Sequence, residues 1–250
     1  MTVRAHVDGS TGYILCATPR TGSTFLCSLL ASTGVLGRPE SYFREPDEVA
    51  WATRFGLETA GNQVRSYEAF VDSVRDAATT ENGVLGARIM WGSLDRLVGG
   101  IGRARRQSDS TTLQAALGPL AFVHLVREDV VGQAVSWARA EQSGYWHQGD
   151  VIRRPVAPDV ARMVALVKTI QDHNASWQAW FATNDLRPCV LTYEALTSDP
   201  GAAVGAIADL VGATIPPAWR PGIVHRKQAD EVNAEWAELL RSALGNEDVG

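Results

Sequence analysis

Residues 13–24 read Tyr-Ile-Leu-Cys-Ala-Thr-Pro-Arg-Thr-Gly-Ser-Thr, and this stretch decides the fold. Its first five residues form an apolar run rich in strand formers, and Thr18-Pro19 interrupts that run. The segment after Gly22 has apolar residues at helical spacing, namely Phe25, Leu26, Leu29 and Leu30. The pattern predicts a buried strand, a tight turn and the start of a helix.

A turn of this kind directs backbone N–H groups and the positive end of a helix at one point, which suits an oxyanion. Arg20 adds a fixed positive charge, and hydroxyl donors follow on Thr21, Ser23 and Thr24. The stretch therefore predicts a cradle for phosphate or sulfate. The alternative at this point is an ordinary strand-to-helix turn.

Composition sets limits on the rest of the chain. A length of 250 residues with 45% hydrophobic content predicts a single domain over 1–250, with its core at about 12–245. The formal net charge of −5 disfavours binding of nucleic acid by the chain as a whole, so an anion site requires local clusters of Arg and Lys.

The three cysteines, Cys16, Cys27 and Cys189, lack the spacing of a disulfide framework or a metal site, and free buried thiols are expected. The first residues lack the pattern of a signal peptide. No apolar run approaches the roughly 18–20 residues that a transmembrane helix needs. A cytoplasmic location is therefore expected.

Strands and helices alternate along the chain. Strands are predicted at 83–90, 120–126 and 189–193, and helices at 66–78, 129–139, 159–183, 200–211 and 230–244. Residues 44–62 and 144–158 are expected to be substrate-facing insertions, the first of them irregular, and 99–112 a solvated basic loop. This order predicts a three-layer α/β/α fold with a central parallel sheet.

Three of the four predicted strands end at or near an arginine: Arg20, Arg88 and Arg127. The fourth ends at Tyr193. Ligands of parallel sheets bind at the carboxyl ends of the strands, so these side chains are expected to share one rim. Arg127, before a helix, and Ser136, within it, are placed to hold one phosphate together.

A magnesium-dependent kinase of the P-loop type needs Gly-x-x-x-x-Gly-Lys-Ser/Thr and a carboxylate for the metal. The loop at 18–24 contains no lysine, and Arg127 occupies the place of the carboxylate. The pattern favours neutralisation of phosphates by arginine, with no metal. The transferred group is then expected to be less charged than a phosphoryl group.

Two stretches resemble known motifs of the sulfotransferases. Residues 13–24 resemble their 5′-phosphosulfate loop, and residues 126–137, Val-Arg-Glu-Asp-Val-Val-Gly-Gln-Ala-Val-Ser-Trp, resemble their 3′-phosphate motif. The loop Pro-Arg-Thr-Gly-Ser-Thr and the stretch Gly-Arg-Pro-Glu-Ser-Tyr-Phe at 37–43 are most similar to the bacterial trehalose 2-sulfotransferase family. Further matches lie at 86–91, 193–196, 228–230 and 235–236.

The resemblance implies a P-loop-like sulfotransferase fold and an enzyme that takes a sulfuryl group from 3′-phosphoadenosine-5′-phosphosulfate (PAPS) to a carbohydrate-type hydroxyl. Adenosine 3′,5′-bisphosphate is the implied product, and a homodimer the implied assembly. The implied contacts of the 5′-phosphate and sulfonate are Pro19, Arg20, Thr21, Gly22, Ser23 and Thr24. Arg127 and Ser136 would hold the 3′-phosphate, with Arg226 and Lys227 as later contributors and Tyr193 near the adenine.

The acceptor hydroxyl needs a general base. The family places a glutamate in the loop after the first helix, which makes Glu40 the candidate here. The family commonly carries its glutamate one place later, where this chain has Ser41, so Glu45 is a second candidate. His147 and His124 are further alternatives, although His124 is expected to be a satisfied core residue.

Expected acceptor contacts are Tyr42, Phe43, Arg88, Trp91 and Trp146, with Trp51 and Tyr145 as further aromatic surfaces. In-line transfer is the expected mechanism, with Arg20 stabilising charge on the sulfonate and on the leaving oxygen. Three alternatives stay open: sulfation of a secondary metabolite, a magnesium-dependent nucleotide kinase, and an anion-binding domain without activity.

Overall fold

A computed structural model gives the structure of the protein and describes residues 11–45, 47–102, 107–144, 156–222 and 231–247. Over these residues the central sheet has four parallel strands in the order β4-β1-β5-β6. They are β1 (Gly12–Ala17), β4 (Leu85–Met90), β5 (Leu120–Val126) and β6 (Cys189–Thr192). The four strands predicted from the apolar runs are therefore confirmed, as is their parallel pairing.

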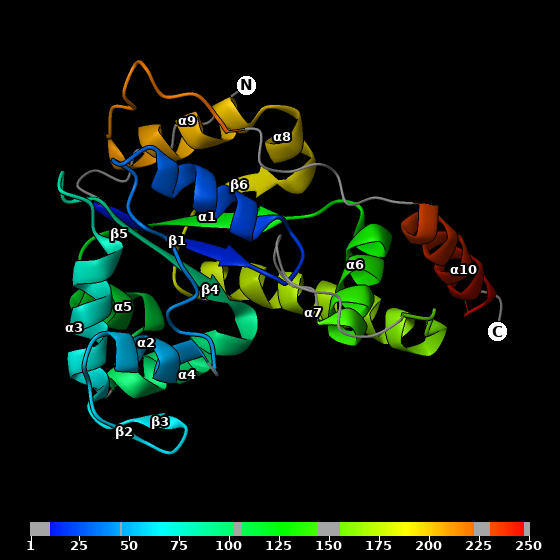
Figure 1. Ribbon diagram of the computed structural model, residues 1–250, viewed down its shortest axis with the longest axis horizontal. Helices are drawn as coiled ribbons and strands as arrows, with labels where there is room; N and C mark the ends of the chain where they lie inside the picture. Colours follow the sequence, from blue (N-terminus) through cyan, green and yellow to red (C-terminus); the bar gives the residue numbers. More distant parts are fainter. Residues whose placement is uncertain (1–10, 46, 103–106, 145–155, 223–230, 248–250) are drawn as a thin grey trace.

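Helices cover both faces of this sheet (Figure 1). Alternate residues of β1 face opposite ways, because strand side chains have a period of two. Tyr13, Leu15 and Ala17 pack under α1 (Ser23–Ser32) and α9 (Pro200–Val211). Ile14 and Cys16 face a second core with α3 (Tyr67–Ala78), α4 (Trp91–Ile101), α5 (Asp109–Leu117) and the end of α7 (Val160–Thr183). The predicted three-layer α/β/α fold is confirmed.

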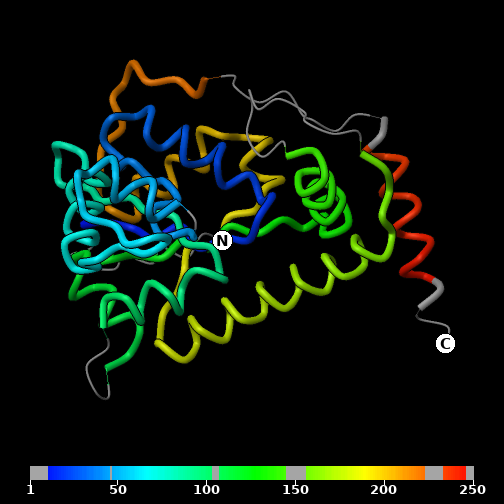
Figure 2. The backbone as a smooth tube through the Cα atoms, turned by 60° about the horizontal axis from the view of Figure 1, so that its bottom comes forward, coloured from blue at the N-terminus to red at the C-terminus, as the bar shows by residue number. Residues whose placement is uncertain are grey.

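A third apolar cluster lies beside the sheet. It joins α6 (Val130–Ser143), the first turns of α7, and α10 (Glu231–Glu247). Figure 2 shows α7 running along one side of the molecule from this cluster to the region of α4 and α5. Ala134, Val135 and Ala138 of α6 are buried against Trp236 and its neighbours. Helix α6 is thus held from behind by two other helices.

The expectation of an irregular segment at 44–62 is wrong. The segment contains α2 (Asp47–Arg54) and a hairpin of β2 (Thr59–Ala60) and β3 (Gln63–Val64). Helix α2 lacks a clean apolar period because Glu48 occupies a core position, where it is only 1% exposed. Arg96 Nε donates to Glu48 at 2.7 Å and Tyr67 Oη donates at 2.8 Å, which makes the buried carboxylate tolerable.

The expectation of one solvated loop at 99–112 is also wrong at both ends. Helix α4 begins at Trp91 directly after β4, with no turn residues between them. Helix α5 begins after Ser108, whose side chain accepts from the N–H of Thr111.

The prediction of Tyr193 as a strand end needs a small correction as well. Tyr193 starts α8 (Tyr193–Ser198), capped by Thr192.

The described helices include none that is long and apolar enough to cross a bilayer.

Candidate functional site

The turn between β1 and α1 has a shape set by hydrogen bonds within the protein. Thr21 Oγ1 donates to the carbonyl of Thr18 at 3.0 Å. Gln133 of α6 donates from Nε2 to Thr18 Oγ1 at 2.8 Å and to the carbonyl of Pro19 at 2.7 Å. Because these contacts come from a rigid helix, the turn is preorganised. The role of Gln133 was not foreseen, although it lies on the same helical face as Ser136, three positions away.

The turn also uses left-handed backbone at two places. Arg20 has a φ of 67° and Gly22 a φ of 80°. A Cβ at Gly22 would lie 2.7 Å from the ring of Tyr193, so glycine is required both by conformation and by space. No side chain of the described residues caps the start of α1. A helix start without a side-chain cap is typical of anion-binding turns.

Arg20 reaches across the rim to α6. Its Nε donates to Ser136 Oγ at 2.9 Å. This contact joins the turn after β1 to the helix after β5, although 116 residues separate the two in sequence. Two candidate phosphate contacts from separate motifs are thus neighbours.

Arg127 lies at the end of β5 next to the same helix. Its guanidinium lies over the ring of Tyr193, 4.6 Å from the centroid, and Nη2 donates to Asp129 at 3.3 Å. Its side chain is 16% exposed, and its Nε has no hydrogen-bond partner among the described residues. A buried N–H without an acceptor is costly in a protein and is expected to face a ligand or water.

Gly132 makes room for Arg127. A Cβ at this position would lie 2.6 Å from Arg127 Nη2. Because Gly132 and Ser136 are four residues apart on α6, they lie on one helical face, so Arg127 and Arg20 approach adjacent turns of that face. The structure therefore brings Arg20, Arg127 and Ser136 to a single rim, as the strand order predicted.

Glu194 stabilises the backbone between β5 and α6. Its two carboxylate oxygens accept the N–H groups of Glu128 at 3.2 Å and Asp129 at 3.3 Å. The Asp129 carboxylate in turn accepts the N–H of Gly132 at 2.9 Å. The segment that follows Arg127 is thereby tied to α8.

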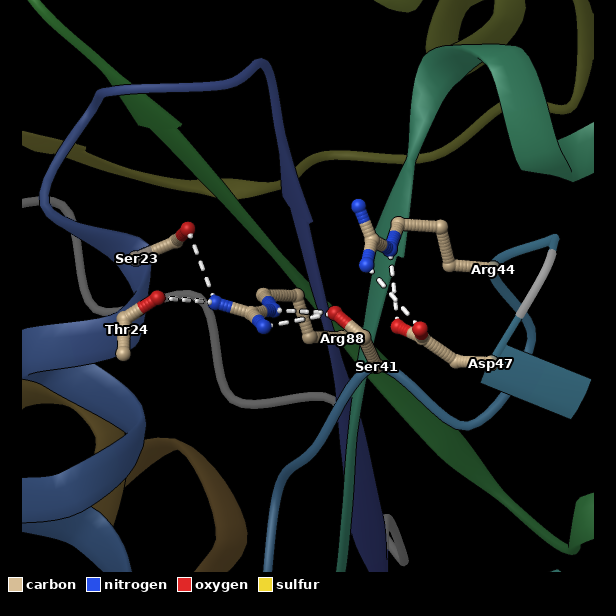
Figure 3. A network of polar contacts seen from close by, with 6 residues as sticks. All are labelled: Ser23, Thr24, Ser41, Arg44, Asp47 and Arg88. Atoms are coloured by element: carbon tan, nitrogen blue, oxygen red, sulfur yellow. Dashed lines mark hydrogen bonds and ion pairs between the residues drawn. The ribbon is translucent and has the colours of Figure 1, made fainter. Parts of the chain in front are cut away.

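Arg88 is buried on the α1 side of β4, and Figure 3 shows its guanidinium between hydroxyls of the start of α1 and of the loop that carries Ser41. Nη1 donates to Thr24 Oγ1 at 2.8 Å and to Ser23 Oγ at 3.2 Å. Nε donates to Ser41 Oγ at 3.0 Å, and Nη2 donates to the same oxygen. Ser41 was not foreseen as part of the site, because nothing in the pattern indicated that residue 88 reaches it.

The loop with the candidate base lies beside Arg88. The side chain of Glu40 is exposed, and its carbonyl accepts the N–H of Arg88 at 3.2 Å. Glu45, the second candidate, forms an ion pair with Arg96 at 3.1 Å. Glu40 is thus joined to β4 through its backbone with an exposed side chain, whereas the Glu45 carboxylate is engaged with α4.

His124 lies in the core, as expected, and is 2% exposed. Burial lowers its pKa to about 4, and its ring packs on Phe181 with 5.4 Å between centroids. The expectation that it is satisfied is wrong, because Nε2 has no hydrogen-bond partner among the described residues. His147 lies outside the described residues.

Two side chains that were expected to contact the acceptor are buried in the core. Tyr42 is 2% exposed and donates to the carbonyl of Arg38, and Phe43 is fully buried against Phe70. Trp51 packs within α2 on Phe55, with ring centroids 5.8 Å apart, so it too is a packing residue. These three aromatic side chains belong to the core around α2 and α3.

Trp91 is half-buried and meets Trp177 edge to face, with 5.1 Å between centroids. It remains at the carboxyl end of β4, where an acceptor would approach. Trp146, Tyr145, Arg226 and Lys227 lie outside the described residues.

The thiols do not add a reactive group to the rim. Cys16 and Cys27 are buried, and Cys189 is half-buried. Burial raises the pKa of Cys27 to about 11, against the opposing effect of Arg88. In the described parts of the chain, no group of three His, Cys, Asp or Glu side chains is placed to hold a metal ion.

Comparison with known proteins gives a consistent set of similarities. A family model described as Stf0 sulphotransferase matches residues 12–243. A trehalose 2-sulfotransferase of Mycobacterium tuberculosis strain Erdman is 29% identical in an alignment of length 256 that spans 92% of this chain and 94% of the relative. A trehalose 2-sulfotransferase of Mycolicibacterium smegmatis is 29% identical in an alignment of length 260 that spans 94% of this chain and 96% of the relative.

Proposed function

The chain belongs to the Stf0 sulphotransferase family and is a sulfotransferase; on that premise we propose that it uses PAPS as donor and a hydroxyl of a trehalose-type carbohydrate as acceptor. The single observation that carries the choice of donor is the joining of two anion-binding elements at one rim. Arg20 of the β1–α1 turn donates to Ser136 of α6, and the side chain of Arg127, which precedes α6, packs against Gly132 one turn earlier on that helix. Two phosphate-binding elements at one rim match a nucleotide phosphorylated at both the 3′ and the 5′ position.

In this proposal the β1–α1 turn holds the 5′-phosphate and the sulfuryl group. Pro19 to Thr24 supply the uncapped N–H groups of α1 and the side chain of Arg20. Arg127 holds the 3′-phosphate, and its Nε, which has no partner among the described residues, is a donor suited to a phosphate oxygen. Ser136 stands between the two halves because its hydroxyl accepts from Arg20 and has a proton to donate.

Tyr193 stands next to the nucleotide in the same scheme. Its ring carries Arg127 on one face and closes over Gly22 at its edge. It orients the arginine that grips the 3′-phosphate and lies within reach of the adenine. Arg226 and Lys227, which lie outside the described residues, are proposed as additional contacts of the 3′-phosphate.

The donor supplies an activated sulfuryl group, whose bond to the 5′-phosphate oxygen breaks as the acceptor oxygen bonds to sulfur. Glu40 removes the proton of the acceptor hydroxyl, because a neutral hydroxyl is a weak nucleophile. Arg20 and the N–H groups of the turn stabilise the negative charge that develops on the departing phosphate oxygen. Proton, sulfuryl group and charge are all accounted for: the proton goes to Glu40, and adenosine 3′,5′-bisphosphate leaves.

The acceptor class rests on the two relatives, which are both trehalose 2-sulfotransferases. Of the aromatic side chains expected to contact the acceptor, Tyr42 and Phe43 are buried and Trp51 packs on Phe55, so we propose the half-buried Trp91 at the end of β4 as the stacking surface. Trp146 is proposed as a second stacking surface and lies outside the described residues. A secondary-metabolite hydroxyl is the alternative acceptor.

Thermal unfolding with added nucleotide tests the donor. Adenosine 3′,5′-bisphosphate at a hundred times its dissociation constant is expected to add about 2.7 kcal/mol to the free energy of unfolding, whereas ATP with Mg²⁺ adds less. Transfer of ³⁵S from PAPS to trehalose, compared with glucose and a phenol, then tests the acceptor. Stabilisation by ATP alone would support a kinase, and binding of bisphosphate without ³⁵S transfer to any hydroxyl would support an inactive anion-binding domain.

A further inference from the structure

Arg88 is a buried cation without a carboxylate partner. It is 6% exposed, and no described Asp or Glu forms an ion pair with it. Its recorded side-chain contacts are four N–H donations to three hydroxyls. An unpaired buried charge is costly, so the arrangement calls for a negative group from outside the protein.

The hydrogen bonds of the three hydroxyls with Arg88 have a fixed direction. A guanidinium only donates, so Ser23, Thr24 and Ser41 all accept from Arg88 and must direct their own protons elsewhere. Among the described residues, none of these three protons has a recorded acceptor. Three O–H donors around one buried cation make a site for an anion with several oxygens.

The three hydroxyls also come from two different segments, a helix start and a loop. Ser23 and Thr24 open α1 directly after the β1–α1 turn, whereas Ser41 follows Glu40 in the loop after α1. Figure 3 shows Arg88 spanning the space between them. A backbone hydrogen bond also joins β4 to the loop of Ser41, since the N–H of Arg88 donates to the carbonyl of Glu40.

We propose that Arg88 is a positioning residue that fixes the hydroxyls of Ser23, Thr24 and Ser41 as donors to the sulfuryl oxygens, and that Ser41 is a previously unassigned contact of that group. This inference rests on the proposed donor, PAPS. Arg88 is therefore assigned to the PAPS site and not, as expected from the sequence, to the acceptor site. Four of the five N–H groups of its guanidinium already donate to hydroxyls of the protein.

The placement of Ser41 has a mechanistic consequence. The residue that touches the sulfuryl oxygens is the immediate neighbour of the residue that removes the acceptor proton. Binding of an intact donor therefore adds a contact to the segment that carries Glu40, which Arg88 already holds. Adenosine 3′,5′-bisphosphate lacks the sulfuryl group and leaves that segment without its contact.

The test compares two ligands that differ only in the sulfuryl group. Dissociation constants of PAPS and of adenosine 3′,5′-bisphosphate are measured by calorimetry without acceptor for wild type, Ser41→Ala and Arg88→Lys. Loss of a hydrogen bond to a charged group predicts about ten- to hundredfold weaker PAPS binding by Ser41→Ala, with bisphosphate binding unchanged. Arg88→Lys keeps the charge but loses the planar fork, so it shows the same selective loss.

Ser73→Ala is the matched control. Ser73 lies on α3, and its hydroxyl donates to the carbonyl of Ala69, so the same substitution there leaves both dissociation constants unchanged. Equal losses for the two ligands in Ser41→Ala, or no loss for PAPS, would overturn the inference while wild-type binding of bisphosphate still supports the proposed function. Failure of wild type to bind either ligand would overturn the proposed function, and the inference with it.

Discussion

Arg20 and Ser136 form one hydrogen bond, Nε to Oγ at 2.9 Å, and it joins the two halves of the rim. The arginine belongs to the turn between β1 and α1, and the serine lies on α6, the helix that follows β5. The bond brings two motifs far apart in sequence together, as the proposed binding of one nucleotide requires. It also shows that the position of Arg20 depends on α6 as well as on its own loop.

Replacement of Arg20 separates activity from folding. Arg20→Gly is expected to slow ³⁵S transfer about 10²–10³-fold, because one preorganised charge contact is lost. The free energy of unfolding is expected to stay within about 1 kcal/mol or to rise, since glycine relieves the left-handed backbone at φ 67°. Asp185→Gly, at φ 51° after α7, is the matched control that changes the backbone without touching the rim. Near-normal transfer by Arg20→Gly would contradict its assigned role.

Gly132→Ala tests the space that Arg127 occupies. Alanine favours a helix by about 1 kcal/mol over glycine, but its Cβ would lie against the Asp129 carboxylate and 2.6 Å from Arg127 Nη2, so the ion pair of these two side chains has to move. We expect weaker binding of adenosine 3′,5′-bisphosphate, measured by calorimetry. Gly205→Ala on α9 is the control, because nothing lies within 4 Å of a Cβ there. Unchanged bisphosphate affinity in Gly132→Ala would remove Arg127 from the nucleotide site.

Two variants can show whether Glu40 or Glu45 is the general base. Glu40→Gln removes the proposed proton acceptor while keeping its shape, and is expected to reduce kcat by about 10²–10⁴-fold with unchanged bisphosphate affinity. Glu45→Gln is the competing variant. Its carboxylate is engaged with Arg96 at 3.1 Å, so we expect the smaller effect there. A larger loss of kcat in Glu45→Gln would transfer the role of base to Glu45.

His124 predicts how stability depends on pH. Burial lowers its folded-state pKa to about 4, while an unfolded histidine has a pKa of about 6.5. The unfolded state therefore binds the proton more readily, so stability is lost as pH falls through this window. Between pH 7 and pH 5 the loss from this residue is about 2 kcal/mol. Urea unfolding of wild type and His124→Leu measures it, and equal pH dependence in both proteins would show that another group titrates.

The sheet was predictable because β1, β4 and β5 are buried on both faces and read as largely apolar runs, whereas β6 is a partly exposed edge strand. The burial of Tyr13 through Ala17 on two opposite sides is the physical basis of that signal. The anion turn was predictable for a similar reason, since Gly22 and the hydroxyls beside it are local features. Contacts between residues far apart in sequence leave no local pattern that could predict them. Ser41 and Gln133 enter the site only because Arg88 and the β1–α1 turn lie beside them in space.

The missed helices have individual causes. Helix α2 carries a charge in the core, Glu48, which is tolerated only through Arg96 and Tyr67 from other helices. Helix α4 starts without a turn and ends in Gly99-Gly100, which is an unfavourable helical sequence. In each case tertiary contacts stabilise a segment whose own sequence favours a loop.

The third apolar cluster gives α6 two working sides. One side carries Gln133 and Ser136 to the β1–α1 turn, and the other buries Ala134, Val135 and Ala138 against α7 and α10. The C-terminal helix therefore supports, from a distance, the helix that fixes this turn. In the proposed site, loss of the Trp236 side chain is expected to weaken donor binding before it unfolds the central sheet.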